Sequence, residues 1–350
     1  MSDGTAQADV QMVPGRLWLR ALVGLCLGLA TAAALWAYLG VSQRELLERL
    51  HDVTAWPLAF AAAGSLVLMG LQSLRWWMVM RPVLPLSYGQ AYRAMAVGFF
   101  FNVLLPARGG DLLRVQYLGK RTGISRAKLL GTEIVDFWSD KWGWVATFPL
   151  ICLLGSPPAW LFKALLAMAF GVVSVGGVLA LMASGLWRSR KDGLRWGPKW
   201  LLNLRDGFAA NQWKRLLLVE TLVAPLPWIW ETFLIAVASH AVGLALTPMQ
   251  AFAVLTAFNI ATAVPSPGNA GSFEGGGTFA LLQFHVDKPA ALAFIVLYHL
   301  TQVVPGVCAG LFVLVMEGEA LFGKTRVFRA RAPALRVEVG SGIVAEPDAG

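Results

Sequence analysis

The sequence contains few charged residues. Aspartate, glutamate, lysine and arginine make up 14% of its 350 residues, whereas hydrophobic residues make up 57%. A soluble domain is about one quarter charged, so this composition excludes an ordinary soluble fold. Apolar runs of about 20 residues, the length that a helix needs to cross a bilayer, recur along the chain. The sequence therefore predicts an all-α, polytopic membrane protein.

Residues that build metal and redox sites are also scarce. The three cysteines, Cys26, Cys152 and Cys308, lie far apart within apolar runs, as is typical of small core residues. The four histidines have no metal-ligand spacing, and G-x-S-x-G, H-E-x-x-H and P-loop motifs are absent. We therefore expect no metal, no cofactor and no ATP site. No polar stretch is long enough for a soluble catalytic domain, so we do not expect an enzyme.

One transmembrane domain, residues 16–322, accounts for most of the chain. The flanking tails, 1–15 and 323–350, are rich in small and polar residues and are expected to be disordered. The first apolar run, 17–40, resembles a signal peptide, but it exceeds the roughly 7–15 apolar residues of a signal-peptide core. We expect it to be retained as the first helix.

The apolar runs differ in length. Two stretches, 92–105 and 249–264, each give only about 20–24 Å of helix at 1.5 Å per residue, and each ends in a segment rich in proline and glycine. The other runs are long enough to span. The six predicted spanning helices are residues 17–40, 56–80, 137–155, 160–187, 216–241 and 290–316.

Positive charge follows the expected topology. Residues 188–215 carry eight Lys and Arg against two acids, and 75–130 is also basic. The positive-inside rule places these segments and both termini in the cytoplasm, as in a protein of the cytoplasmic (inner) membrane. Segment 195–215 is either an ordinary basic loop or a helix lying on anionic lipid. Because the charge lies where topology requires it, we expect no nucleic-acid partner.

The same topology constrains the two short regions. Region 92–130 must start and finish on the cytoplasmic side, and region 249–285 must start and finish outside. Two re-entrant broken hairpins that enter from opposite faces meet both requirements. Two full crossings of the membrane in each region would also meet both requirements and would add further spans. The segments are short for a full crossing, however.

The two regions share a pattern. The first reads GFFFNVLLPARGGDLLR and the second TAFNIATAVPSPGNAGSFE, each with Phe-Asn, then proline, a glycine-rich break and a charged residue. Helices flank both in the same order, which divides the domain into repeats at about 17–155 and 160–316. Broken segments at corresponding positions of inverted repeats mark the binding site of many transporters.

Backbone groups at such breaks cannot face lipid, so we expect the two breaks to meet inside the protein. Their free N–H groups and arginines suit an anionic head group such as phosphate. We expect Glu274 to pair with an arginine of the first hairpin, with His299 as an alternative partner. The predicted residues are Asn102, Pro106, Arg108, Gly109, Gly110, Asp111 and Arg114 in the first hairpin, and Asn259, Pro265, Pro267, Gly268, Gly271 and Glu274 in the second.

Acids within the other apolar runs extend this site. Glu133, Asp136 and Asp140 share one helical face, where they either hold the hairpin arginines and guide protons or face water at a helix end. Glu231 lies near the middle of its span, where an ionisable residue is expected to have a function. The alternative is that it forms a structural pair with a buried polar group. Tyr298, next to the candidate histidine, completes the predicted site.

Three other charged residues are assigned to the membrane interface. Arg75 and Arg81 flank a pair of tryptophans and are interpreted as interfacial anchors. Glu220 lies near the start of its span and is expected to be solvated.

The motifs at 100–114, 133–136 and 265–274 together resemble the lysylphosphatidylglycerol-synthase transmembrane family, also called flippase-like proteins. The resemblance covers roughly 17–317 and implies a polytopic inner-membrane protein linked to moving lipids between leaflets. Relatives include the flippase half of aminoacyl-phosphatidylglycerol synthases and proteins of hopanoid and polyprenyl-glycan pathways. The sequence departs from the family pattern at Ala107, at Asn269-Ala270, and at His299, where the family often has arginine. The soluble aminoacyl-transferase domain is absent, so lipid aminoacylation is not expected.

The expected function is therefore lipid translocation, with a polar, anionic or polyprenyl- or hopanoid-type lipid bound by its head group between the hairpins. The alternative is a membrane enzyme or accessory subunit acting on a glycolipid or phospholipid. A homodimer or a lipid-synthesis complex is the candidate assembly.

Overall fold

A computed structural model describes residues 26, 30, 33, 37, 40–81, 86–105, 108–183, 218–264 and 266–322. Within these residues the structure is helical and contains no strand. The elements are α2 (Gln43–His51), α3 (Ala55–Met80), α4 (Tyr88–Leu104), α5 (Gly109–Thr122), α6 (Arg126–Cys152), α7 (Ala159–Ala183), the π-helical turn η1 (Val219–Val223), α10 (Pro225–Ser239), η2 (His240–Val242), α11 (Pro248–Ala261), η3 (Pro267–Asn269), α12 (Ser272–Gln283) and α13 (Lys288–Phe322).

Four helices within the described ranges are long and apolar enough to cross a membrane: Ala55–Met80, Ala159–Leu181, Val219–Val242 and Lys288–Glu317. They match four of the six predicted spans. The predicted span 137–155 overlaps α6, which begins earlier, at Arg126, and ends three residues earlier, at Cys152. The chain is thus a helical membrane protein with several apolar helices. The first predicted span, 17–40, lies almost wholly outside the described residues, as do the two tails and the basic loop 188–215.

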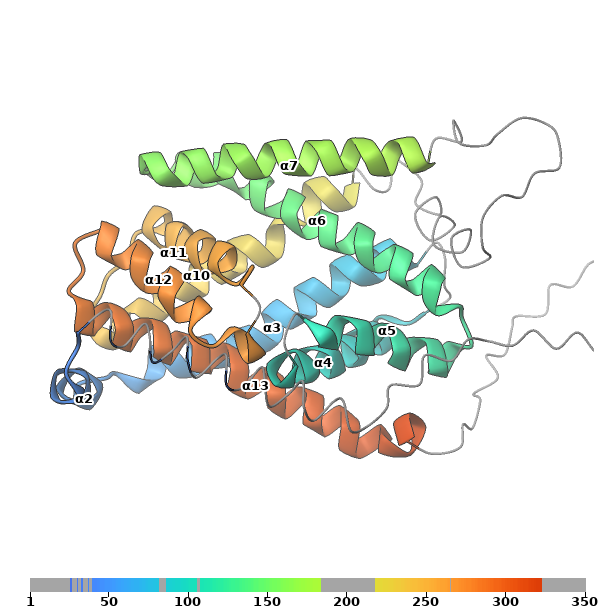
Figure 1. Ribbon diagram of the computed structural model, residues 1–350, viewed down its shortest axis with the longest axis horizontal. Coiled ribbons are helices and arrows are strands. Elements are labelled where there is room, and N and C mark those ends of the chain that lie inside the picture. The colour runs from blue at the N-terminus through green and yellow to red at the C-terminus, as the bar shows by residue number, and fades with distance from the viewer. Residues whose placement is uncertain are drawn as a thin grey trace, which may run out of the picture.

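The two short predicted segments each form one arm of a helical hairpin. Helix α4 has 17 residues and packs along α5, and α11 has 14 residues and packs along α12. In Figure 1 the pair α4 and α5 lies toward one end of the long axis and the pair α11 and α12 toward the other. Helix α13 runs past both pairs and contacts α4 and α12.

The tips of the two hairpins touch. Turn η3, at the tip of the second hairpin, packs against α4 of the first. A Cβ added to Gly268 would lie 3.5 Å from a side-chain methyl of Val103. The breaks in the two hairpins therefore lie next to each other inside the helix assembly.

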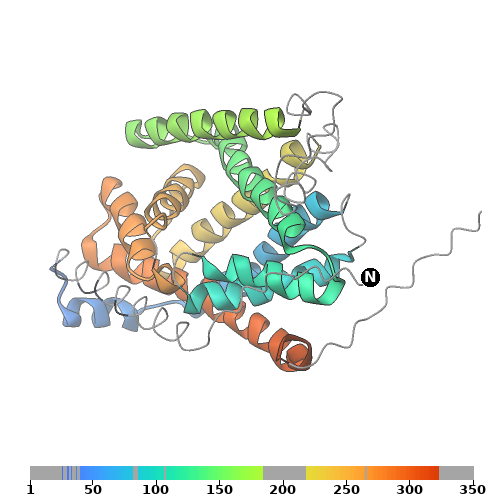
Figure 2. The same ribbon diagram turned by 45° about the vertical axis from the view of Figure 1, so that its right-hand side comes forward.

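Helix α7 lies at the outer edge of the assembly in both views (Figures 1 and 2). Many of its large apolar side chains are exposed, and Phe170 is 77% exposed. By contrast, the residues from Met249 to Phe258 of α11 are almost all buried. Exposed apolar surface on an outer helix is what a lipid-facing helix presents, whereas α11 belongs to the protein core.

Candidate functional site

A cavity of about 810 Å³ lies between the two hairpins, and side chains of α3, α6, α7, α10 and α13 complete its wall. Its surface mixes charged side chains with apolar ones such as Phe99, Val103 and Ile260. It is thus the place where the hairpin breaks and the charges of the spanning helices meet. The predicted site residues that line it are Asn102, Arg108, Asp111, Arg114, Asp136, Glu231, Asn259 and Gly268.

Asn102, in the last turn of α4, closes the first hairpin. Its Oδ1 accepts a hydrogen bond from the backbone N–H of Gly110 at 2.8 Å, and its Nδ2 donates to Oδ1 of Asp111 at 3.0 Å. A Cβ on Gly110 would lie 2.0 Å from the carbonyl oxygen of Gly98, so only glycine allows this approach. The asparagine and the glycine of the motif therefore set the geometry of the break.

Arg108 precedes α5 and has a left-handed backbone, with φ of 54°. Its side chain is 57% exposed, whereas those of Arg75 and Arg114 are 5% and 7% exposed. Its Nε lies 3.8 Å from Oδ2 of Asp111, and its guanidinium lies 5.7 Å from the ring centroid of Phe137. Of these three arginines lining the cavity, Arg108 is the most loosely held.

Arg114 is buried, and its side chain contacts carboxylates of α6. It forms an ion pair with Glu133, and its Nη2 lies 3.9 Å from Oδ2 of Asp136. Its guanidinium also covers the ring of Trp76 at 4.5 Å. The predicted role of Glu133 and Asp136 in holding a hairpin arginine agrees with this geometry.

Arg75 also belongs to this buried cluster, and its assignment as an interfacial anchor was wrong. Its Nε donates to Oδ1 of Asp136 at 2.9 Å, and its Nη1 donates to Oδ1 of Asp140 at 2.6 Å. Two carboxylates one turn apart on an apolar helix need a buried cation, which is the signal that could have found it. Arg81 is exposed and lies over the ring of Trp77.

Lys141 and Glu231 face the cavity from α6 and α10. The Nζ of Lys141 lies 2.9 Å from Oδ2 of Asp140 and within 6 Å of the ring centroids of Trp144 and Trp228. Glu231 is half-buried, and within the described part of the chain it forms neither an ion pair nor a hydrogen bond. Glu231 is therefore the carboxylate of this wall that lacks a cation.

Glu274 pairs with His299, so the expected arginine partner was wrong and the alternative is correct. Oε1 of Glu274 lies 2.5 Å from Nδ1 of His299, and Oε2 accepts from the backbone N–H of Gly271 at 2.6 Å. Phe273 stacks on the histidine ring at 4.2 Å. Arg114 cannot serve as the partner because Glu133 and Asp136 already engage it.

The remaining predicted residues that the structure describes do not line the cavity. Gly109 starts α5, Pro267 lies in η3, and Gly271 precedes α12 with φ of 81°. Tyr298 is buried beneath Phe273. Pro106 and Pro265 lie outside the described residues.

Glu220, expected to be solvated, is instead buried at 3% exposure within the π-helical turn η1. The π-helical turn, which the sequence does not reveal, carries it into the helix packing between α3 and α6. Glu220 does not line the cavity, so it is a buried acid separate from the site.

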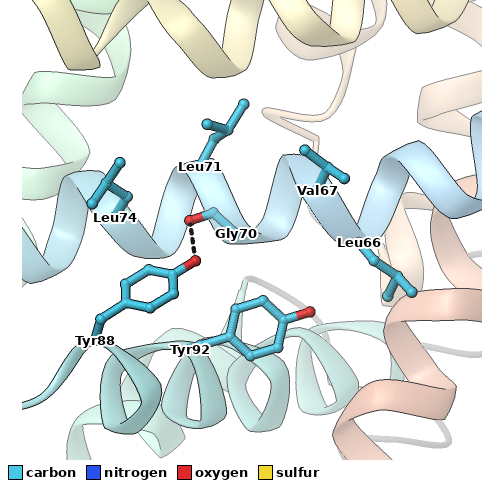
Figure 3. Close-up of a pocket in the computed structure, with 7 residues that line it drawn as sticks. All are labelled: Leu66, Val67, Gly70, Leu71, Leu74, Tyr88 and Tyr92. Carbon is cyan, nitrogen blue, oxygen red and sulfur yellow. Dashed lines mark hydrogen bonds between the residues drawn. The ribbon is translucent and has the colours of Figure 1, made fainter.

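A second hollow, of about 360 Å³, lies between α3 and α4 (Figure 3). The hydroxyl of Tyr88 donates to the carbonyl oxygen of Gly70 across it at 3.0 Å. Among the residues that the structure describes, only apolar residues, glycine and tyrosine line this hollow. Its lining residues are Leu66, Val67, Gly70, Leu71, Leu74, Tyr88 and Tyr92.

These features define a class: a helical membrane protein with a charged cavity between two short helical hairpins. The chain belongs to the family described as the lysylphosphatidylglycerol synthase TM region, whose model matches residues 20–310. The resemblance read from the hairpin motifs is thereby confirmed. A comparison with curated proteins gave no match.

Proposed function

We propose that this protein translocates a polar-headed lipid between the leaflets of the cytoplasmic membrane, and that it acts as a transporter and not as an enzyme. The observation that carries the proposal is the cavity of about 810 Å³, which both hairpins line and which combines charged with apolar walls. A lipid needs both kinds of surface, because its head group must leave water while its tails stay in lipid. Membership of a lipid-related family supports this assignment.

An inverted repeat with re-entrant hairpins is the architecture that we propose for this task. The helix order α3, α4–α5, α6 is matched by α10, α11–α12, α13. Both hairpins also begin with the same capping box: Ser87 with Gln90, and Thr247 with Gln250. Each box lies in a similar stretch, LSYGQAY and LTPMQAF. Alternate opening of the two halves would expose the cavity to each leaflet in turn.

The head group is proposed to bind at the meeting point of the two breaks. Arg108 offers a guanidinium with only a distant carboxylate, and guanidinium binds phosphate in bidentate fashion. The N-terminal end of α5 adds backbone N–H groups beside it. An anionic lipid, or a polyprenyl- or hopanoid-type lipid with a polar head, fits this chemistry. Both termini are proposed to lie in the cytoplasm.

A membrane enzyme, or an accessory subunit of a lipid-synthesis complex, is the second candidate. Four carboxylates line the cavity, and a general acid or base needs such a group next to its substrate. Asp136 and Asp140 are held by Arg75, however, which leaves neither free to exchange a proton readily. Glu231, by contrast, has no ion-pair partner among the described residues, so the test must separate the two functions. We propose the transporter because the cavity combines charged with apolar walls.

A flip assay tests the proposal. The full chain is reconstituted into liposomes that carry a head-group-labelled anionic phospholipid or a labelled polyprenyl phosphate, and a membrane-impermeant quencher reports the label in the outer leaflet. We expect protein-dependent loss of the protected inner-leaflet signal. Arg108→Gln should slow it, whereas Arg44→Gln, on the exposed face of α2, should not.

Rates equal to protein-free liposomes for every lipid would contradict the proposal. Mass spectrometry of the same lipids distinguishes the enzyme, since only an enzyme would leave a covalently altered lipid.

A further inference from the structure

We propose that Glu231 is a proton-binding site that faces the cavity, and that Lys141 supplies the positive charge when the proton leaves. The occupancy of this site by a proton requires only the cavity. Its use to drive lipid movement rests, in addition, on the proposed function.

The first observation is that Glu231 stands alone among the acids of the cavity wall. Asp136 and Asp140 both lie within ion-pairing distance of Arg75, and Asp111 lies within 4 Å of two arginines. Glu231 has no such partner among the described residues, although it lies within the apolar span Val219–Val242. An isolated ionised carboxylate is costly in such surroundings and is neutralised by a proton instead.

Charged and titratable groups from three elements face Glu231. Helix α6 contributes Asp140 and Lys141, and α3 contributes Arg75 through its contact with Asp140. Helix α13 contributes Tyr298, which is within electrostatic reach of Glu231, and His299, which lines the same cavity. Helix α11 carries no titratable side chain. Of the two cations near Glu231, Arg75 is buried and held by two carboxylates, whereas Lys141 contacts one.

The second observation is that Asp140 contacts two cations, one of which, Arg75, it shares with Asp136. Nη1 of Arg75 lies 2.6 Å from its Oδ1, and Nζ of Lys141 lies 2.9 Å from its Oδ2. If Lys141 moves away, Asp140 keeps Arg75. The Lys141 ammonium already lies 5.3 Å from the ring centroid of Trp228, one helical turn before Glu231 on α10.

The site therefore has two states. In one, Glu231 holds a proton and Lys141 lies on Asp140, as in this structure. In the other, the carboxyl group of Glu231 has released its proton to water in the cavity, and the flexible lysine side chain has moved to the new carboxylate. Release of the proton adds one negative charge to the cluster, and Lys141 places a cation beside that charge while Arg75 stays on Asp136 and Asp140.

Labelling with dicyclohexylcarbodiimide tests the site without any knowledge of the lipid. This apolar reagent modifies protonated carboxyl groups in apolar surroundings. The full chain in liposomes is treated over a series of pH values, and mass spectrometry locates the modified residue. We expect Glu231 to be labelled at low pH and to lose its label as the pH rises, because the proton is released.

Two variants sharpen the result. Lys141→Met removes the replacement cation, so the label on Glu231 should persist to higher pH. Glu48→Gln, on exposed α2, should leave the Glu231 titration unchanged. The proposal is overturned if wild-type Glu231 in the folded protein stays unlabelled at every pH, or if Lys141→Met leaves the titration in place or moves it to lower pH.

The coupling to transport is tested separately, in the flip assay with an imposed pH gradient. We expect the wild type to respond to the gradient and Glu231→Gln to lose that response. A wild-type flipping rate that is the same with and without the pH gradient would refute the coupling but not the proposed function. An absence of all flipping would refute the proposed function, and the labelling would still decide whether Glu231 binds a proton.

Discussion

Arg75 of α3 and Asp136 of α6 form a buried ion pair, with Nε of Arg75 2.9 Å from Oδ1 of Asp136 and the two side chains 5% and 3% exposed. The pair joins two helices through residues that are 61 positions apart in sequence. It lies on the wall of the cavity and fixes the carboxylates that face it. The pair therefore links the packing of the spanning helices to the electrostatics of the site.

Breaking this pair should destabilise the protein strongly. Arg75→Met leaves a buried carboxylate without its main partner, and removal of one member of a buried pair costs about 3–5 kcal/mol. Asp136 retains Arg114 at 3.9 Å, so we expect a loss near the lower end of that range. Unfolding in detergent measures it. The double variant Arg75→Met with Asp136→Leu should recover part of the loss, and an unchanged midpoint in the single variant would contradict the structural role.

Gly110→Ala should open the first hairpin. The added methyl group would meet two backbone atoms, the carbonyl oxygen of Gly98 at 2.0 Å and the amide nitrogen of Asn102 at 2.5 Å. Backbone cannot move aside as a flexible side chain can, so we expect a lower thermal midpoint and loss of flipping. Gly89→Ala, in the same hairpin, has nothing within 4 Å and should be neutral or stabilising by up to about 1 kcal/mol. Equal behaviour of the two variants would argue against the close helix contact.

The N-terminal turn of α2 should become less stable at low pH. Hydrogen bonds from the side chain and then the backbone N–H of Ser42 lower the pKa of Glu45, which is exposed. A carboxyl group whose pKa is lower in the folded state stabilises above its unfolded pKa, and this support is lost as the pH falls through the folded value. Amide hydrogen exchange in α2, corrected for the intrinsic pH dependence, should therefore rise on acidification. Ser42→Ala should weaken this pH dependence, because the backbone N–H of residue 42 still donates to Glu45, whereas Glu48→Gln should keep it in full.

The sequence predicts the helices well because span length is a local property. The predicted span 56–80 differs from Ala55–Met80 by one residue, and proline and glycine mark both hairpins. Partner choice was harder to predict. The role of Arg75 depends on which face of α3 meets α6, and the apolar run does not reveal that face. The partner of Glu274 depends on a competition in which Glu133 and Asp136 occupy Arg114 first.

The likeness between the two hairpins extends beyond the Phe-Asn match. The capping boxes at Ser87 and Thr247 lie at the start of corresponding helices, each preceded by leucine and each with glutamine three residues on. The distance from Ser87 to Asn102 is three residues longer than that from Thr247 to Asn259. An alignment of the two hairpins on their Phe-Asn motifs therefore does not align Ser87 with Thr247 unless it includes a gap of three residues.

The asparagines of the two Phe-Asn motifs should respond differently to alanine. Asn102 bonds across its hairpin to Gly110 and Asp111, whereas the Nδ2 of Asn259 donates only to the carbonyl oxygen of Leu255 in its own helix, at 3.0 Å. Asn102→Ala leaves the backbone N–H of Gly110 without its partner, and such an unsatisfied group costs about 1–3 kcal/mol.

We therefore expect Asn102→Ala to lower the unfolding midpoint clearly and Asn259→Ala to change it little, as measured side by side in one detergent. Both residues line the cavity, so both variants should slow flipping, but Asn259→Ala should do so in a protein of nearly wild-type stability. If Asn259→Ala were the less stable of the two, the second break would rest on this asparagine more than on the turn of Gly268 and Gly271. If both variants kept full stability, the first hairpin would not depend on the side-chain bonds that close it.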